Sequence, residues 1–148
     1  MVAIGNPSRE EVAAYVYKEC STNAFCWIQI GDKLTSDQLF DRFGQSIAFN
    51  KASERSIVGA PFHSVDGIEK KGIAKICDPI TSDCGTSNNG HCRKQIGQAI
   101  TGDLEYDALC SISLSRDGTI AAIGSPYADN AIRKNVGKIQ FFELQNSG

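Results

Sequence analysis

The stretch CSTNAFCWIQIG, at residues 20–31, has a counterpart further along the chain, CGTSNNGHCRKQIG at residues 84–97. In each stretch, one cysteine precedes and one follows a small polar segment, and each stretch ends in Gln-Ile-Gly. The two Gln-Ile-Gly runs begin 66 residues apart. A loop that recurs at such a distance is typical of a repeat protein, in which each unit is one supersecondary element.

A second motif, Gly-x-Pro after small or β-branched residues, occurs three times in the chain. It is found in VAIGNP (2–7), SIVGAPF (56–62) and AAIGSPY (121–127), and its residues are Gly5, Pro7, Gly59, Pro61, Gly124 and Pro126. Because glycine has no Cβ, we expect another part of the chain to approach closely at these glycines. The prolines lack a backbone donor, so strand pairing should stop there.

Alternating apolar and polar residues predict four short antiparallel strands in each unit, and no amphipathic helix is expected. The expected first strands are SIAFN (46–50) and SISLS (111–115), and the Gly-x-Pro motifs lie in second strands. The expected third strands are VAAYVYK (12–18), GIAKIC (72–77) and GKIQFFEL (137–144). WIQI (27–30) and RKQI (93–96) are the expected fourth strands.

This strand pattern predicts an all-β fold, namely a partial β-propeller made of four-stranded antiparallel blades, with a β-sandwich as the alternative. The predicted boundaries are a partial blade at 1–41 (strands 2–4), a complete blade with the cysteine-bracketed loop at 42–107, and a partial blade at 108–148 (strands 1–3). A closed ring needs at least about four blades. We therefore expect Met1 to be an internal or mis-assigned start.

The outer faces of such a fragment should be apolar and exposed. We expect Val2 or Ile4 to be exposed at one end of the fragment, and Phe141 or Phe142 at the other. A chain with these faces uncovered should associate with itself.

The middle unit resembles the FG-GAP repeat of integrin-α-type β-propellers. The resemblance is carried by FGQSIAF, SIVGAPF and GIAKI, with Phe43-Gly44 followed by Gly59-Ala60-Pro61. The longer run WIQIGDKLTSDQLFDRFGQSIAFN is also similar to repeats of large extracellular proteins of algae and bacteria. In the last unit, Ala108-Leu109 is taken as the counterpart of Phe-Gly. The resemblance implies a ring of about seven blades, an extracellular or cell-surface location, and a role in protein binding and adhesion.

These observations predict a non-catalytic protein-interaction or adhesion module that is a fragment of a larger extracellular protein. Its expected partners are a protein or glycan ligand and the further blades of the full-length protein. The alternative is a structural accessory domain of a larger secreted enzyme or receptor. A third possibility is a decayed or truncated gene product. No cofactor is expected.

Catalytic residues are not assigned, because His63 and His91 are the only ordinary general bases and no nucleophile motif accompanies them. Four aspartates recur in the loops before the first strands: Asp37, Asp41, Asp103 and Asp107. Their recurrence in successive units favours a turn-stabilising role over a pair of catalytic carboxylates.

The six cysteines predict two short bridges, Cys20–Cys26 and Cys84–Cys92, provided that the chain matures in an oxidising compartment. Cys77 is expected in the core and Cys110 in a first strand. A zinc site from Cys77, Cys84, His91 and Cys92 is the alternative, although its spacing is not the usual one. No calcium site is assigned, since NKASER (50–55) and SRDG (115–118) offer too few oxygen ligands.

The charge of the chain argues against nucleic acid as a partner. The 148 residues carry a formal charge of −2, and the basic residues form no stripe. Membrane insertion by this segment is not expected either, because no apolar run approaches the length of a membrane helix. The start, MVAIGNPSREE, lacks the basic and apolar regions of a signal peptide.

Overall fold

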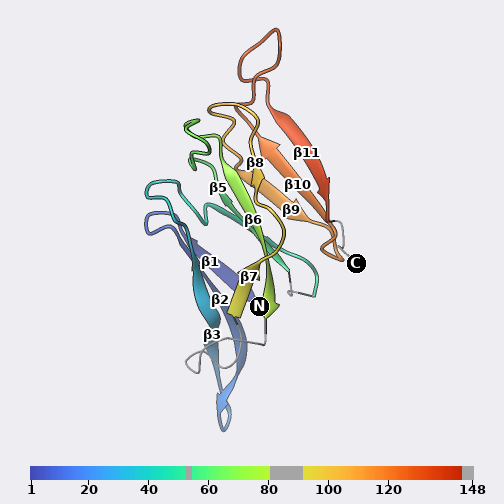
Figure 1. Ribbon diagram of the computed structural model, residues 1–148. Helices are drawn as coiled ribbons and strands as arrows, with labels where there is room; N and C mark the ends of the chain where they lie inside the picture. The colour runs from blue at the N-terminus through green and yellow to red at the C-terminus, as the bar shows by residue number, and fades with distance from the viewer. Residues whose placement is uncertain (53–54, 81–91, 145–148) are drawn as a thin grey trace.

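The computed structural model describes residues 1–52, 55–80 and 92–144, and these residues form β-strands and no helix (Figure 1). The expected all-β class is confirmed. The strands are β1 (Val2–Asn6), β2 (Glu11–Ser21), β3 (Ala24–Thr35), β4 (Ser46–Phe49), β5 (Ser56–Ala60), β6 (Ile73–Ile80), β7 (Cys92–Gln95), β8 (Ile100–Thr101), β9 (Ser111–Leu114), β10 (Ile120–Ser125) and β11 (Lys138–Glu143). No helix among the described residues could span a membrane.

The strands form three antiparallel sheets, in which neighbours along the chain pair with each other. The first sheet has the order β1-β2-β3, the second β4-β5-β6-β7 with β8 also paired to β6, and the third β9-β10-β11. None of the described sheets closes on itself. Every expected strand has a counterpart among these, and β8 is additional.

The fourth strands differ from the prediction, because they continue beyond Gln-Ile-Gly. β3 runs through Gly31 to Thr35 and stays paired with β2 across a register shift between Val12 and Ala14. In the second sheet the same path is interrupted after Gln95 and resumes as β8, which pairs with the start of β6. Gly31 and Gly97 both have positive φ, at 69° and 63°, so the chain bends at the same point in each unit. The predicted fourth strands stop at this bend, and the prediction missed the strand beyond it.

The second sheet is buried on both faces, since all five residues of β5 are buried. Val58 and Ala60 belong to an apolar core shared with the first sheet, which supplies Val12. Ile57 points the other way, into a core shared with the third sheet, which supplies Ile123. Successive side chains of a strand point to opposite faces, so one short strand contributes to two cores.

The first and third sheets each leave one face exposed. Phe141, on β11, is 74% exposed, whereas its neighbour Phe142 packs against the core between the second and third sheets. At the other end of the stack, Val2 and Ile4 of β1 are exposed. The expected exposed residues at both ends are therefore confirmed.

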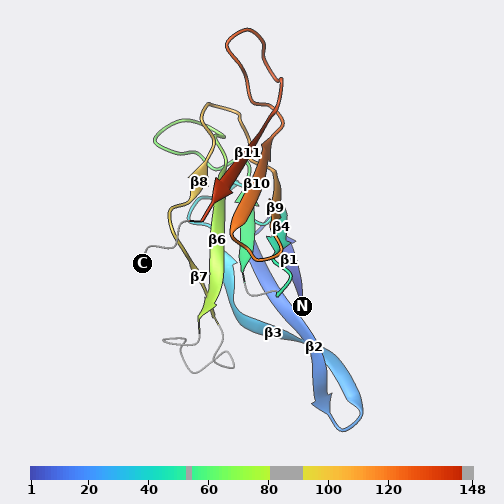
Figure 2. The ribbon, with the colours of Figure 1, turned by 90° about the vertical axis from the view of Figure 1, so that its right-hand side faces the viewer.

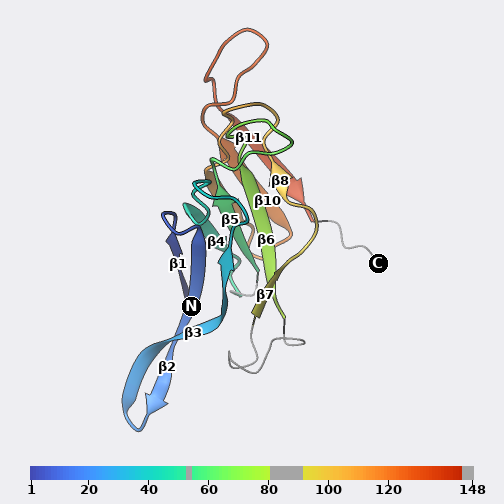
Figure 3. The ribbon, with the colours of Figure 1, turned by 60° about the vertical axis from the view of Figure 1, so that its left-hand side comes forward.

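The connections between strands gather at the two ends of the sheets. Segments 36–45, 61–72 and 102–110 lie at one end, where the β10–β11 connection also projects (Figures 1 and 3). The β2–β3 hairpin extends away at the opposite end (Figure 2). Its turn is tighter than the expected five-residue loop, because strand pairing continues to Ser21 and Ala24.

Candidate binding face

Three connections at one end of the sheets, residues 36–45, 61–72 and 102–110, form a continuous surface, here called the loop face. Backbone hydrogen bonds tie them together: the N–H of Phe62 donates to the carbonyl of Asp41 (3.0 Å), and the N–H of Tyr106 donates to the carbonyl of Glu69 (3.2 Å). The N–H of Ala108 donates to Lys70 in the same way (3.3 Å). The loops therefore hold fixed positions relative to one another.

Asp41 organises the first loop from a fully buried position. One of its carboxylate oxygens accepts the backbone N–H of Phe43 (2.8 Å), and the other accepts the hydroxyl of Ser36. Nδ1 of His63 lies 2.8 Å from this second oxygen, so the carboxylate also fixes the start of the 61–72 loop. The geometry assigns His63 and Asp41 to holding two loops together.

Asp107 stabilises the turn in the equivalent loop of the next unit. Its carboxylate accepts the backbone N–H groups of Asp103 (2.8 Å) and Leu104 (3.0 Å). The ammonium group of Lys138, on β11, lies 2.6 Å from Asp103 and 3.5 Å from Asp107. Burial lowers the pKa of Lys138, but these two carboxylates outweigh it and raise the pKa overall. The predicted turn-stabilising role of Asp41 and Asp107 is confirmed.

The two loops share an unusual backbone shape. Phe40 and Arg42 have φ values of 63° and 61°, and the equivalent residues Tyr106 and Ala108 have values of 62° and 48°. Residues with a Cβ adopt this left-handed region at an energetic cost, and such strain concentrates at functional sites. At Phe40 the conformation is supported by Glu10, whose buried carboxylate accepts the Phe40 N–H at 3.0 Å. Strain that appears in both units at the same place is a built feature of the loop face.

This backbone shape presents aromatic rings to solvent. Phe40 is 83% exposed and Tyr106 is 47% exposed, and the neighbouring Leu39 and Leu104 are exposed as well. Large apolar side chains that are held rigidly and exposed together are typical of a protein-binding surface.

Cations alternate with the rings across the loop face. The guanidinium of Arg42 lies 4.4 Å from the ring centre of Phe62, and the ammonium of Lys70 lies 5.5 Å from Phe62 and 5.2 Å from Tyr106. These distances suit cation–π attraction. The negative charges of Glu69 and then Glu105 raise the pKa of the Tyr106 hydroxyl. The loop face thus combines apolar anchors with charged groups of both signs.

The Gly-x-Pro glycines lie where other parts of the chain approach. A Cβ on Gly5 would lie 2.0 Å from the carbonyl oxygen of Gly44, so backbone meets backbone there. At Gly59 the close neighbour is the Ser46 hydroxyl (2.4 Å), and at Gly124 it is the Ser111 Cβ (3.2 Å). The prolines Pro7, Pro61 and Pro126 each follow the end of a second strand, and Pro61 is fully buried.

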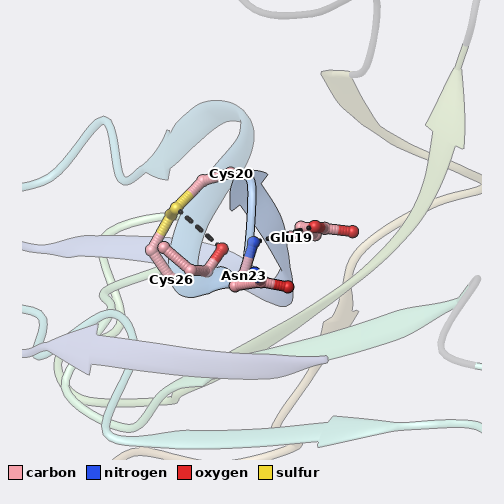
Figure 4. The surroundings of a disulfide bond; sticks show 5 residues. Glu19, Cys20, Asn23 and Cys26 are labelled. Atoms are coloured by element: carbon pink, nitrogen blue, oxygen red, sulfur yellow. Dashed lines mark hydrogen bonds between the residues drawn. A yellow bond between two sulfur atoms is a disulfide. The ribbon is translucent and has the colours of Figure 1, made fainter.

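Cys20 and Cys26 form a disulfide across the β2–β3 hairpin, with their Cα atoms 6.0 Å apart (Figure 4). Between them, Asn23 adopts a φ of 64°, and its N–H donates to the Glu19 carboxylate. The pairing of Cys84 and Cys92, like the alternative zinc site with His91, lies outside the described residues. Cys77 is buried in the core, and Cys110 directly precedes β9 rather than lying in it.

The same hairpin carries exposed aromatic residues that the sequence analysis did not single out. The ring of Tyr17 lies 5.6 Å from that of Phe25 and 5.1 Å from that of Trp27, and all three side chains are more than half exposed. Strand alternation places Tyr17 and its cross-strand partner Trp27 on one face, and that pattern could have revealed the cluster.

The segments considered for calcium use their oxygens within their own turns. Asn50 accepts the N–H of Arg55, and Asp117 accepts hydrogen bonds from Ser115 and Thr119. Within the described ranges, no three His, Cys, Asp or Glu side chains lie close enough together to hold a metal ion.

Comparison with known proteins finds no protein-family model that matches the chain and no curated protein that matches it. The FG-GAP resemblance therefore remains a prediction made from the residues quoted above.

Proposed function

We propose that this chain is a non-catalytic protein-interaction module, built from FG-GAP-like propeller blades, that binds a protein partner through its loop face. The proposal combines the repeat resemblance in the sequence with the stacking of three small antiparallel sheets. A β-sandwich has two sheets around one core, whereas here the second sheet lies between two cores. Stacking of this kind supports the propeller-blade interpretation and leaves room for further blades on the exposed outer faces.

One observation carries the binding role. Phe40 and Tyr106 occupy equivalent places in two units, and both are exposed on a strained backbone that buried carboxylates and interloop hydrogen bonds hold in place. In a complex, a rigid aromatic side chain contributes contact area at a low entropy cost.

The cysteine bridge supports an extracellular or cell-surface location. Disulfides persist in oxidising compartments and are rare in the cytosol. The bridge between Cys20 and Cys26 stabilises an exposed hairpin.

Screening the immobilised chain against arrays of extracellular proteins and glycans, followed by variants, tests the proposal. The double variant Phe40→Ala/Tyr106→Ala should weaken binding of a protein hit at least tenfold, because it removes both anchors. The matched control is Tyr127→Ala/Ile132→Ala, which removes two exposed side chains outside the loop face and should change binding less than twofold. Circular dichroism checks that all variants are folded. Equal affinity for both double variants, or hits among glycans alone, would contradict the proposal.

A further inference from the structure

Each boundary between sheets is filled by a segment that crosses the end of the preceding sheet. At the first boundary the crossing residues are Phe43 and Gly44. Phe43 is buried in the core between the first and second sheets. Gly44 is so close to the first sheet that a Cβ on it would lie 2.8 Å from the Val12 side chain. Upstream in the same crossing segment, the Ser36 N–H donates to the carbonyl of Glu10 (3.0 Å).

The second boundary repeats this arrangement with Leu109. Leu109 is fully buried in the core between the second and third sheets, and a Cβ on Gly72 would lie 2.4 Å from its backbone nitrogen. The Gly102 N–H donates to the carbonyl of Gly72 (3.2 Å), as Ser36 does to Glu10.

Hydrogen bonding also fixes which residues are equivalent. The backbone N–H of Cys110 donates to the carbonyl of Gly124, and the backbone N–H of Gly44 donates in the same way to the carbonyl of Gly59, both at 3.1 Å. This corrects the alignment made from sequence: Leu109-Cys110, not Ala108-Leu109, stands in the place of Phe43-Gly44.

In the third sheet, the surface equivalent to the one that receives Leu109 is uncovered and forms an open hollow of about 460 Å³. Its lining includes Gly124, Pro126, Gly137, Lys138 and Ile139. Gly124 stands in the place of Gly59, and Gly137, with a φ of 74°, stands in the place of Gly72, with a φ of 81°. The hollow is therefore built from the same parts as the surface that receives Leu109.

The sheet face beside the hollow is apolar in the same pattern. Ile139 pairs with Gly124 and Phe141 with Ala122, as Ala74 pairs with Gly59 and Ile76 with Ile57. In the second sheet these positions are covered by the third sheet and form part of its core. In the third sheet Ile139 and Phe141 are 69% and 74% exposed.

We propose that this hollow is a binding site for an extended peptide segment of the chain's own repeat type. The segment carries a bulky apolar residue, phenylalanine or leucine, a few residues before a β-strand. Its apolar side chain enters beside Gly124 and Gly137, and its strand lies over Ile139 and Phe141. The hollow borders the loop face at Lys138, which pairs with Asp103 and Asp107, but the proposal does not depend on the proposed function.

A peptide with the sequence of residues 38–50, QLFDRFGQSIAFN, is the probe, since it carries Phe43 and the β4 strand. With a fluorescent label on the peptide, anisotropy should report saturable binding to the intact chain with a Kd below about 1 mM. Changing Phe43→Ala in the peptide should weaken binding at least tenfold, because the buried ring is lost. Changing Leu39→Ala in the peptide should alter it less than twofold, since Leu39 is exposed at its own place in the fold.

Matched isoleucine variants of the chain locate the site. Ile139→Asp should weaken peptide binding at least tenfold, whereas Ile132→Asp, on the β10–β11 connection and 88% exposed, should change it less than twofold. Both side chains are largely exposed, so both variants should keep the parent's fold. Absence of saturable binding, equal binding by the Phe43→Ala peptide, or full binding by the Ile139→Asp chain would each overturn the proposal. The last result would mean that the peptide replaces the chain's own β4 segment.

Discussion

Asp37 and Asp41 belong to one loop, yet the fold uses them differently. Asp41 is fully buried and bonded to three groups, whereas the side chain of Asp37 is 79% exposed and lies 3.6 Å from Lys75. Their recurrence in the sequence indicates a turn role, because aspartate bonds nearby backbone donors. The burial of Asp41 rather than Asp37 depends on how the 61–72 loop packs against the 36–45 loop. The sequence around the two aspartates does not reveal this packing.

Replacing Asp41 by alanine should destabilise the chain by about 3 kcal/mol, because the buried Phe43 N–H and the Ser36 hydroxyl would lose their acceptor. The matched change Asp37→Ala should cost less than about 1 kcal/mol, as is usual for an exposed ion pair. Urea unfolding of the two variants and the parent measures the difference. Equal losses for the two variants would show that Asp41 does not have this role.

Asp117 provides a test that depends on pH. Hydrogen bonds from the Ser115 hydroxyl and then from the Thr119 N–H and hydroxyl lower its pKa from 3.8 to about 2. A pKa lowered by folding stabilises the folded state above the unfolded-state value, and this contribution is lost as the pH falls from about 4 toward 2. An NMR titration should find the carboxyl midpoint near pH 2, and Ser115→Ala should move it upward. A parental midpoint near 3.8 would contradict these hydrogen bonds.

At the scale of the strands, alternating patterns together with the repeated Gly-x-Pro and Gln-Ile-Gly motifs located every element except β8. That strand has two residues and pairs with β6 only because Gly97 redirects the chain. The loop face was also hidden from the sequence. Its alternating cations and rings come from three separate connections: Arg42, Phe62, Lys70 and Tyr106. In addition, Phe40 and Tyr106 adopt a left-handed backbone conformation that is unusual for their residue types.

The β2–β3 hairpin should depend on its disulfide for stability but not for binding by the loop face. Bridges across short loops contribute about 2 kcal/mol, so Cys20→Ala/Cys26→Ala should lower the Tm by about 5 °C. Cys110→Ala, which removes a free and partly exposed thiol, is the control and should leave the Tm almost unchanged. Calorimetry under non-reducing conditions makes the comparison. A double variant as stable as the parent would mean that strand pairing alone holds the hairpin.

At the scale of the whole molecule, repetition at spacings of 54 to 66 residues was enough to predict several similar all-β units. The repeats could not show which face of each sheet packs against which neighbouring sheet. The structure shows this at β5, where Ile57 and Val58 enter different cores. The propeller arrangement itself remains a proposal, because three stacked sheets form only part of any ring.

The exposed outer faces predict self-association. Sedimentation velocity over a range of concentrations should show dimers and larger species for the parent chain, because Ile4 and Phe141 leave apolar surface in water. The variant Ile4→Lys/Phe141→Lys should sediment as a monomer. A parent chain that stays monomeric at every concentration would mean that these faces do not mediate self-association.

Hydrogen exchange of the Ile4→Lys/Phe141→Lys variant tests the stacked arrangement most directly, since association cannot then protect the outer sheets. The account predicts that the amides of β5 and of the β5-paired part of β6 exchange slowest, because their sheet is covered on both faces. Amides of β2 and β10, which are also central strands but lie in sheets with one open face, should exchange faster. Equal protection of β5 and β10 would contradict a second sheet enclosed between the other two.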